Sequence, residues 1–392
     1  MTIKTRKLLL ISSILAFLII TPFIIFYALG FNFDFKKKEI VTTGGLYLKV
    51  TPKEVKVFIN NELKAENSLY TFGNDLFIKN LPETENFHNL EVRKDGYYTW
   101  KKEIAIKSSL VTEFKSILLL KKKPDLKLTK LKNIDEIEGN SKIKNLERFL
   151  GIGIKKFSIE NNDVFFISDN KKLYKFDDSS SKSSVLLTDI IAFTKNYNSL
   201  YFIDDKGVLL TKEIDGTESR RLADFGTLFN NQEAIDMKAV NGVVMIKYKN
   251  DLFLLNSEKS QIEKIAENIT DFKFDNQGKK ILYSKESTFK NLNLKEIWVY
   301  YLESRIQPLI DAREASLIYS TSSKIENPSF VGPDEEQIIF SKPEDGISVI
   351  DIDLRGGQNS VLWIEVKNTK INYQGKTLLF EDKDKVFSVE LY

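Results

Sequence analysis

Residues 190–214 read IIAFTKNYNSLYFIDDKGVLLTKEI. Two apolar runs flank a short polar loop, the second run ends at Asp204, and a turn containing Gly207 leads into a third run. Short alternating runs bounded by Asn, Asp and Gly are typical of antiparallel β-strands. The stretch therefore predicts three consecutive strands of a meander, which is the unit of an all-β fold.

The same pattern recurs along the C-terminal two thirds of the chain. Consecutive positions equivalent to Asp204 lie 36 to 57 residues apart. These equivalent positions are Ser168, Lys247, Ser284, Ser341 and Glu381. This spacing is centred on the length of a four-stranded propeller blade. Six copies predict a six-bladed β-propeller over residues 125–392, similar in repeat shape to WD-like and TolB-type propellers. The longest spacing predicts surface loops at Glu286–Lys295 and Asp311–Glu326.

The last copy stops at the end of the sequence after its third strand, so its fourth strand has to come from elsewhere. Closed propellers leave only short, protected sheet edges. The segment LKLTKLK at 126–132 is a free strand ahead of the first copy. We expect it to pair with the last strand and complete the sixth blade.

The N-terminal region predicts a membrane segment. After a short basic tail, residues 1–7, no charged side chain occurs over residues 8–33. This length exceeds the roughly 20 apolar residues that span a bilayer and the apolar core of a secretory signal. We expect a transmembrane signal anchor, with cleavage near Gly30 as the alternative. The N-terminus is expected in the cytoplasm and the bulk of the chain outside, because long domains are exported largely regardless of their charge. In this orientation four aromatic residues are expected at the outer membrane–water interface: Tyr27, Phe31, Phe33 and Phe35.

Residues 40–121 predict a small β-sandwich. Short alternating runs are separated by turns such as Asn60-Asn61, Gly73-Asn74 and Asp95-Gly96. The segments TPKEVKVFIN (51–60), KNLP (79–82) and VRKDGYYTW (92–100) resemble the PEGA domain, a surface β-sandwich of bacterial single-span proteins. The resemblance implies a spacer or surface attachment module without catalytic residues. The chain departs from the family's Pro-Glu-Gly-Ala turn, because Lys53 follows Pro52.

Three aromatic residues close to the Asp95-Gly96 turn are the candidate ligand platform: Tyr97, Tyr98 and Trp100. On a strand after Gly96, Tyr98 and Trp100 share a face with Ile104 and Ile106, which favours a place in the sandwich core. The alternative is an exposed aromatic surface for sugars or peptidoglycan.

The sequence gives little support for catalytic activity or a cofactor. His88 is the only histidine and there is no cysteine, which excludes a His-based triad in the propeller, a thiolate metal site and a disulfide framework. The net charge of +3 does not indicate the basic surface that nucleic-acid binding requires. We therefore expect no catalytic residue, cofactor or metal site.

Acidic clusters are the remaining candidates for chemistry, and turn formation explains most of them. The clusters are Asp177-Asp178, Asp204-Asp205, Asp334-Glu335-Glu336, Glu344-Asp345, Asp351 with Asp353, and Glu381-Asp382-Lys383-Asp384. The alternative is a propeller hydrolase or lyase that acts on a polysaccharide with channel carboxylates.

The sequence as a whole predicts an all-β protein apart from one N-terminal transmembrane helix. It would be a non-catalytic cell-envelope protein in the cell membrane, with a propeller that binds a protein or glycan partner and no nucleic acid. A purely structural spacer is a third possibility.

Overall fold

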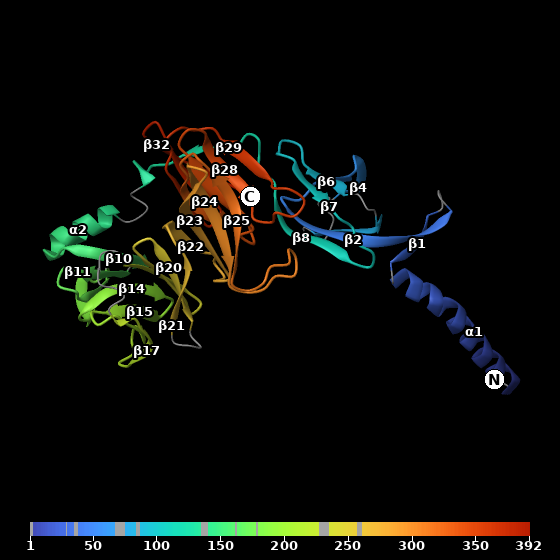
Figure 1. Cartoon of the computed structure of the whole chain (residues 1–392), viewed down its shortest axis with the longest axis horizontal. Helices are drawn as coiled ribbons and strands as arrows, with labels where there is room; N and C mark the ends of the chain where they lie inside the picture. Colours follow the sequence, from blue (N-terminus) through green and yellow to red (C-terminus); the bar gives the residue numbers. More distant parts are fainter. Residues whose placement is uncertain are drawn as a thin grey trace.

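A single helix projects from one end of a body built of β-sheets (Figure 1). The computed structural model describes residues 3–28, 30–34, 38–66, 75–83, 87–134, 140–160, 163–177, 179–226, 235–256 and 261–392. Phe35, Asp178 and the turn Gly73-Asn74 lie outside these residues, as does the side chain of Tyr27. Helix α1 spans Ile3–Ala28, and its segment Thr5–Phe26 is long and apolar enough to cross a membrane. Its length and composition are typical of a membrane anchor or a signal sequence.

Two four-stranded sheets follow α1 and form a sandwich. The first sheet contains β1 (Phe31–Asp34), β2 (Glu39–Thr51), β5 (Asp75–Pro82) and β8 (Val111–Leu118). The second contains β4 (Glu62–Glu66), β3 (Lys56–Ile59), β6 (His88–Arg93) and β7 (Trp100–Ile104), in that order. Strand β8 runs parallel to β2, and the other pairs are antiparallel.

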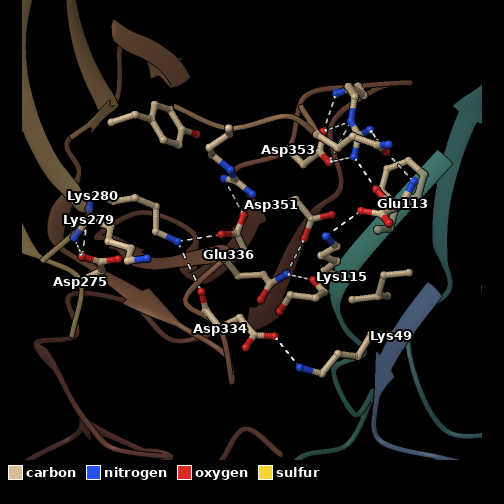
Figure 2. A pocket seen from close by; sticks show the side chains of 18 of the residues that line it. Lys49, Glu113, Lys115, Asp275, Lys279, Lys280, Asp334, Glu336, Asp351 and Asp353 are labelled. Atoms are coloured by element: carbon tan, nitrogen blue, oxygen red, sulfur yellow. Dashed lines mark hydrogen bonds and ion pairs between the residues drawn. The ribbon is translucent and has the colours of Figure 1, made fainter. Parts of the chain in front are cut away.

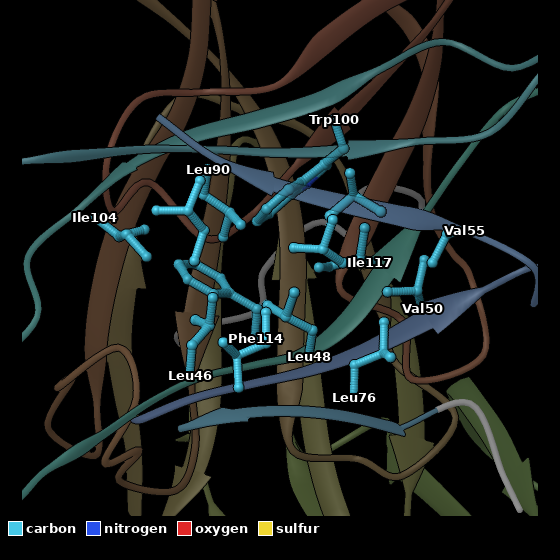
Figure 3. Close-up of a cluster of buried hydrophobic side chains, with 14 of the residues drawn as sticks. Leu46, Leu48, Val50, Val55, Leu76, Leu90, Trp100, Ile104, Phe114 and Ile117 are labelled. Atoms are coloured by element: carbon cyan, nitrogen blue, oxygen red, sulfur yellow. The ribbon is translucent and has the colours of Figure 1, made fainter. Parts of the chain in front are cut away.

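The sandwich core follows from the period-two pattern of its strands. Leu46, Leu48 and Val50 alternate along β2 and have no exposed surface. They meet apolar side chains of the facing sheet, among them Leu90 and Trp100 (Figure 3). The sandwich is therefore a separate hydrophobic unit with its own core.

Six four-stranded antiparallel sheets follow within the described part of the chain, and we number them 1 to 6. Sheet 1 contains β10 (Ile154–Glu160), β11 (Asp163–Ser168), β12 (Leu173–Asp177) and β13 (Lys182–Leu187). Sheet 2 contains β14 (Ile190–Asn196), β15 (Ser199–Asp204), β16 (Val208–Glu213) and β17 (Ser219–Asp224). Sheet 3 contains β18 (Ile235–Val240), β19 (Val243–Tyr248), β20 (Asp251–Asn256) and β21 (Gln261–Ala266).

Sheets 4 to 6 continue the series. Sheet 4 contains β22 (Ile269–Phe274), β23 (Lys280–Phe289), β24 (Leu292–Tyr301) and β25 (Glu314–Thr321). Sheet 5 contains β26 (Glu326–Val331), β27 (Gln337–Lys342), β28 (Gly346–Asp351) and β29 (Ser360–Ile364). Sheet 6 contains β30 (Ile371–Gln374), β31 (Thr377–Asp382), β32 (Lys385–Glu390) and β9 (Lys127–Leu128).

The fourth strand of sheet 6 comes from the segment that precedes the other sheets. Leu128 pairs with Phe387 and Lys127 with Ser388, and Thr129 donates a backbone hydrogen bond to Val386. Of the segment 126–132 expected at this place, strand β9 comprises only these two paired residues. Strand β9 therefore pairs with only part of β32, namely Phe387 and Ser388.

Two segments of sheet 4 differ from the surface loops that the sequence predicted, so both predictions are wrong. Glu286–Lys295 continues the β23–β24 ladder, with Glu286 paired to Lys295. Lys290 and Asn291 have positive φ, so a two-residue turn lets the strands pair to their tips. Asp311–Glu326 contains strand β25, which pairs with β24. The extra residues in this part of the sequence lengthen strands β23 and β24 and form strand β25, so they extend the sheet rather than interrupt it.

Buried apolar clusters join each sheet to the next from sheet 1 to sheet 6. Alternate side chains of strand β11 pack in two different clusters. Phe165 and Ile167 face sheet 2, whereas Val164 and Phe166 face the opposite way. Among the described residues no such cluster joins sheet 6 to sheet 1. A closed ring of blades therefore stays a prediction.

The free face of sheet 1 is covered by helix α2, Asn140–Leu150 (Figure 1). The expectation of a single helix is wrong here, because Ile143, Leu146 and Leu150 have helical spacing and form an apolar stripe. Ile143 and Leu146 are each 6% exposed and pack on Val164 and Phe166.

We expect Leu146→Ala to lower the free energy of unfolding by about 2–5 kcal/mol, since it leaves a cavity between α2 and sheet 1. Phe149 is on the same helix but is 65% exposed, so Phe149→Ala serves as the matched control and should cost clearly less. Urea unfolding followed by circular dichroism measures both changes. Equal losses would show that α2 does not cover sheet 1 in solution.

Candidate functional site

Buried polar groups meet at the interface between the sandwich and sheets 4 and 5, among them Lys102, Lys280, Gln337 and Asp351. We call this interface the junction. It encloses a cavity of about 550 Å³, lined by strands β2, β7 and β8 on one side and by turns of sheets 4 and 5 on the other (Figure 2). Ligand sites favour such places between domains. The cavity is therefore the candidate site.

One carboxylate and two cations form the charged wall of the cavity. Glu336 accepts a hydrogen bond from Lys280 Nζ at 2.8 Å and forms an ion pair with Arg305, whose Nη1 lies 2.9 Å from the carboxylate (Figure 2). Lys280 is 6% exposed and also donates to the carbonyl of Glu335 at 2.7 Å. Glu336 is thus engaged by two cations of sheet 4, which makes it a link between sheets 4 and 5.

Tyr301 places a polar atom in the cavity that has no hydrogen-bond partner in the described part of the chain. Its hydroxyl is buried, and the side chain is 1% exposed. Burial raises the pKa of Tyr301, so the hydroxyl stays protonated at neutral pH. A buried hydroxyl without a partner costs free energy, which a polar ligand or a water would recover.

Trp100 and Asp351 connect the sandwich to sheet 5. The Trp100 indole N–H donates to Asp351 Oδ2 at 2.6 Å, and Gln337 Nε2 donates to Asp351 Oδ1 at 3.3 Å. Gln337 also donates to the carbonyl of Ser116 on β8 at 2.7 Å. Burial raises the pKa of Asp351 to about 6, although the nearby Lys102 ammonium and the two donors oppose that rise. The junction therefore contains a carboxyl that titrates in mildly acidic solution.

We expect the raised pKa of Asp351 to make the folded state more stable as the pH falls from 7 to 4. The folded state binds the proton near pH 6 and the unfolded state only near pH 3.8, so the penalty for ionisation is relieved in that window. Unfolding free energies of wild type and Asp351→Asn at several pH values test this. Their difference should change by on the order of 2–3 kcal/mol across the window. A constant difference contradicts the assignment.

Backbone groups dock directly across the junction. Glu103 N–H donates to the carbonyl of Gly356 at 2.8 Å. Asn359 brackets Lys101, accepting from its N–H at 2.9 Å and donating to its carbonyl at 2.8 Å. The buried Lys102 ammonium donates to the carbonyls of Asp353 and Gly357. These contacts fix strand β7 against the turn between β28 and β29.

The edge of strand β8 is capped by side chains from the other unit. Gln307 accepts from Glu113 N–H at 2.6 Å and donates to the Val111 carbonyl at 2.8 Å, as a neighbouring strand would. Arg355 donates to the Glu113 carbonyl at 2.7 Å while its guanidinium binds both oxygens of Asp353. An edge that would otherwise be open to pairing is thus closed.

The three aromatic residues proposed as a platform are divided among packed environments. Trp100 is 5% exposed and its ring meets Phe114 edge-on at 5.2 Å in the sandwich core. Tyr97 packs partly on the same core, and Tyr98 packs on the cluster between sheets 5 and 6. The core interpretation accounts for Trp100, but Tyr98 packs outside the sandwich core in which it was expected. A role of the three residues in ligand binding stays a prediction.

The acidic clusters divide into turn residues and junction residues. Asp204 accepts from the N–H groups of Lys206 and Val208, and Asp177 accepts from Ser179, as the turn interpretation expects. Hydrogen bonds from the Ser179 and Ser180 side chains lower the pKa of Asp177 to about 2. Four residues of the other clusters line the junction instead: Asp334, Glu336, Asp351 and Asp353. The sequence marked these residues as acidic clusters but did not indicate that they meet at one site, because partners such as Trp100 and Lys49 are remote along the chain.

Lysines on the innermost strands bind groups of other sheets. Lys156 donates to the carbonyl of Ile235, Lys238 to the carbonyl of Phe272, and Lys273 to the hydroxyl of Ser329. These bonds join sheets 1 and 3, 3 and 4, and 4 and 5. Among the described residues no group of His, Asp and Glu side chains is arranged to hold a metal ion.

These features define a mostly β chain with a propeller-like array of four-stranded sheets. No protein-family model and no curated protein matches the chain. Among solved structures, YCF48 from Cyanidioschyzon merolae aligns with 86% of this chain and 96% of its own, at 10% identity and a TM-score of 0.41. The β-propeller domain of a Myceliophteria thermophila protein aligns with 78% of this chain and 93% of its own, at 10% identity and 0.37. The tricorn protease aligns with 83% of this chain but 35% of its own, at 12% identity and 0.45. The similarity concerns the fold alone.

Proposed function

We propose that the chain is a membrane-anchored protein of the cell envelope that works as a binding scaffold without catalytic activity. In this proposal α1 is an uncleaved anchor with its N-terminus in the cytoplasm. The PEGA-like sandwich is a spacer or attachment module, and the six sheets are the blades of a six-bladed propeller. A purely structural spacer remains the simplest variant of the same idea.

The observation that carries the proposal is that the charged groups of the junction are already engaged in ion pairs and hydrogen bonds within the protein. Glu336 is paired with Lys280 and Arg305, Asp353 with Arg355, and Asp351 accepts two hydrogen bonds. General acid–base chemistry needs a group that is free to exchange protons with a substrate. Asp351 joins sheet 5 to the sandwich through Trp100, whereas the ion pairs of Glu336 join sheets 4 and 5 and Asp353 positions Arg355. Carboxylates engaged in this way support a structural role.

The anchored topology is tested with the full chain carrying a C-terminal tag in bacterial cells. We expect the tag to sediment with membranes and to be removed by protease added to intact spheroplasts, because the bulk of the chain lies outside. A tag released into the soluble fraction would indicate a cleaved signal sequence. A tag protected from protease would contradict the orientation.

Partner binding is tested by cross-linking the full chain in cells and isolating it with its neighbours. We expect a specific protein or a cell-wall glycan to be recovered with wild type at levels well above an unrelated anchored protein. Recovery of nothing above that control would support the spacer.

The rival proposal, a polysaccharide hydrolase or lyase, needs two free carboxylates in the channel. The innermost strands carry Asp236 and Asp271, and Asp271 lies 3.9 Å from the Lys238 ammonium. Release of reducing ends or unsaturated products from cell-wall and plant polysaccharides would favour the enzyme. Loss of that release in Asp236→Asn and Asp271→Asn would assign it to the channel.

A further inference from the structure

Two pairs of exposed apolar side chains lie on or next to the strands that follow helix α1. Phe33 on β1 is 45% exposed and Ile40 on β2 is 66% exposed, and the two residues are paired across the strands. Leu110 and Val111, at the start of β8, are 57% and 36% exposed. We call these four residues the apolar rim. Apolar side chains grouped on a surface mark a contact with a partner or a membrane.

Hydrogen bonds fix the apolar rim to the end of the helix. Gly30, two residues after α1, accepts from the Thr43 backbone N–H at 2.6 Å, and Ser109 N–H donates to the Thr43 carbonyl at 3.1 Å. A side chain at Gly30 would lie 2.5 Å from the Thr43 carbonyl oxygen and 2.9 Å from the Ser109 nitrogen. Leu110 follows directly on Ser109, so it is held beside the exit of the helix.

Contacts between α1 and β1 continue this connection. The rings of Phe26 and Phe31 meet edge-on, with centroids 5.5 Å apart. Figure 1 shows β1 and the start of β2 extending sideways from the end of α1 rather than in line with it. A helix that spans a bilayer would therefore lay this hairpin along the membrane surface.

The depth of the apolar rim follows from the length of the chain. The membrane-spanning segment ends at Phe26, and Gly30 comes four residues later. Two helical and two extended steps cover at most about 10 Å. The headgroup layer on each side of the hydrocarbon is about 5–8 Å thick. Gly30 and the groups bonded to it thus lie in or next to that layer.

We propose that the apolar rim is a lipid-contacting face, by which the sandwich rests on the bilayer and the rest of the body is held in one orientation to the membrane. The inference rests on the proposed anchor. The occupant is the boundary between headgroups and acyl chains, because side chains with no charge gain free energy there by burial. Exposed lysines at the same end, Lys38 and Lys107, are suited to the headgroups.

The natural absence of cysteine allows a direct test in the full chain. Ile40→Cys and Leu110→Cys are each labelled with the environment-sensitive fluorophore NBD and reconstituted in phosphatidylcholine nanodiscs, with or without doxyl-labelled lipid. Tyr197→Cys is the matched control, because Tyr197 is 76% exposed in a turn of sheet 2. All three positions are exposed, so the label does not disturb a core.

We expect the probes at positions 40 and 110 to be quenched by doxyl lipid about twofold or more, and the probe at 197 to be unaffected, as shallow burial at the interface requires. Membrane-bound protein with no quenching at 40 and 110 overturns the lipid-contacting face and leaves the anchor intact. Protein that fails to enter nanodiscs overturns both. Absence of quenching together with disulfide formation between unlabelled Ile40→Cys copies would assign the apolar rim to self-association and overturn the lipid contact.

Discussion

Replacing Gly356 by Ala is expected to separate the sandwich from sheet 5 while leaving the apolar core of each unit intact. A side chain at Gly356 would lie 2.0 Å from the Glu103 carbonyl oxygen and 2.8 Å from its carbon, so strand β7 has to move away. That movement breaks the Glu103 to Gly356 hydrogen bond and weakens the bonds of Lys102 and Asn359 nearby. Backbone groups cannot yield as a flexible side chain would.

Limited proteolysis in the connecting segment Lys121–Asp125 measures the separation. We expect cleavage there to be faster by about tenfold or more, which corresponds to about 1.4 kcal/mol of lost interface. Gly357→Ala is the matched control: Gly357 also has a positive φ, 96°, but its added methyl group meets no atom within 4 Å. Backbone strain alone should cost about 1–2 kcal/mol of fold stability without separating the units. Similar cleavage rates for both variants would contradict the direct contact.

Trp100→Ala is expected to cause the largest loss of stability. The ring is buried in the sandwich core against Phe114, and truncation of a buried Trp costs about 3–5 kcal/mol. Asp351 also loses a donor, which adds about 1–3 kcal/mol because the carboxyl remains buried. Chemical unfolding with separate probes for each unit measures the total.

Trp100→Phe separates the two contributions. It keeps an aromatic ring in the core and removes the N–H, so the cost should be smaller and should come mainly from Asp351. We expect Trp100→Phe to recover part of its loss at pH 5, where protonated Asp351 needs fewer donors, whereas Trp100→Ala does not. A loss below about 1 kcal/mol for Trp100→Ala would show that the ring is not in the core.

Strands and turns, which depend on residues close together in the sequence, could be predicted from local sequence patterns. The alternation of Leu46, Leu48 and Val50 indicated strand β2, and the recurrence of residues such as Asp204 and Ser341 indicated the repeated sheets. Turn chemistry explained Asp204, whose oxygen accepts from two N–H groups of its own turn. Strand β9 was expected beside the last sheet because an unpaired edge needs a partner.

The junction could not be predicted, because its partners are remote in sequence. Asp351 resembles Asp204 in the sequence, since both end a strand, yet Asp351 meets Trp100, 251 residues away. Lys280 reads as a surface lysine and is buried against Glu336. The full length of helix α2 was not predicted for a different reason: the segment was expected to be a loop with one or two helical turns, since an isolated helix of this length is marginal and packing on sheet 1 stabilises it.

The most direct test of the central claim is a distance measurement across the junction. Spin labels on Glu62→Cys in the sandwich and Glu344→Cys in sheet 5 report how the two units sit, and the chain has no other cysteine. Pulsed electron resonance on the full chain should give one narrow distance distribution, which Gly356→Ala broadens and Gly357→Ala does not. A broad distribution in the otherwise unchanged chain would mean that the sandwich and the sheets move independently, and would contradict the account of a single rigid body.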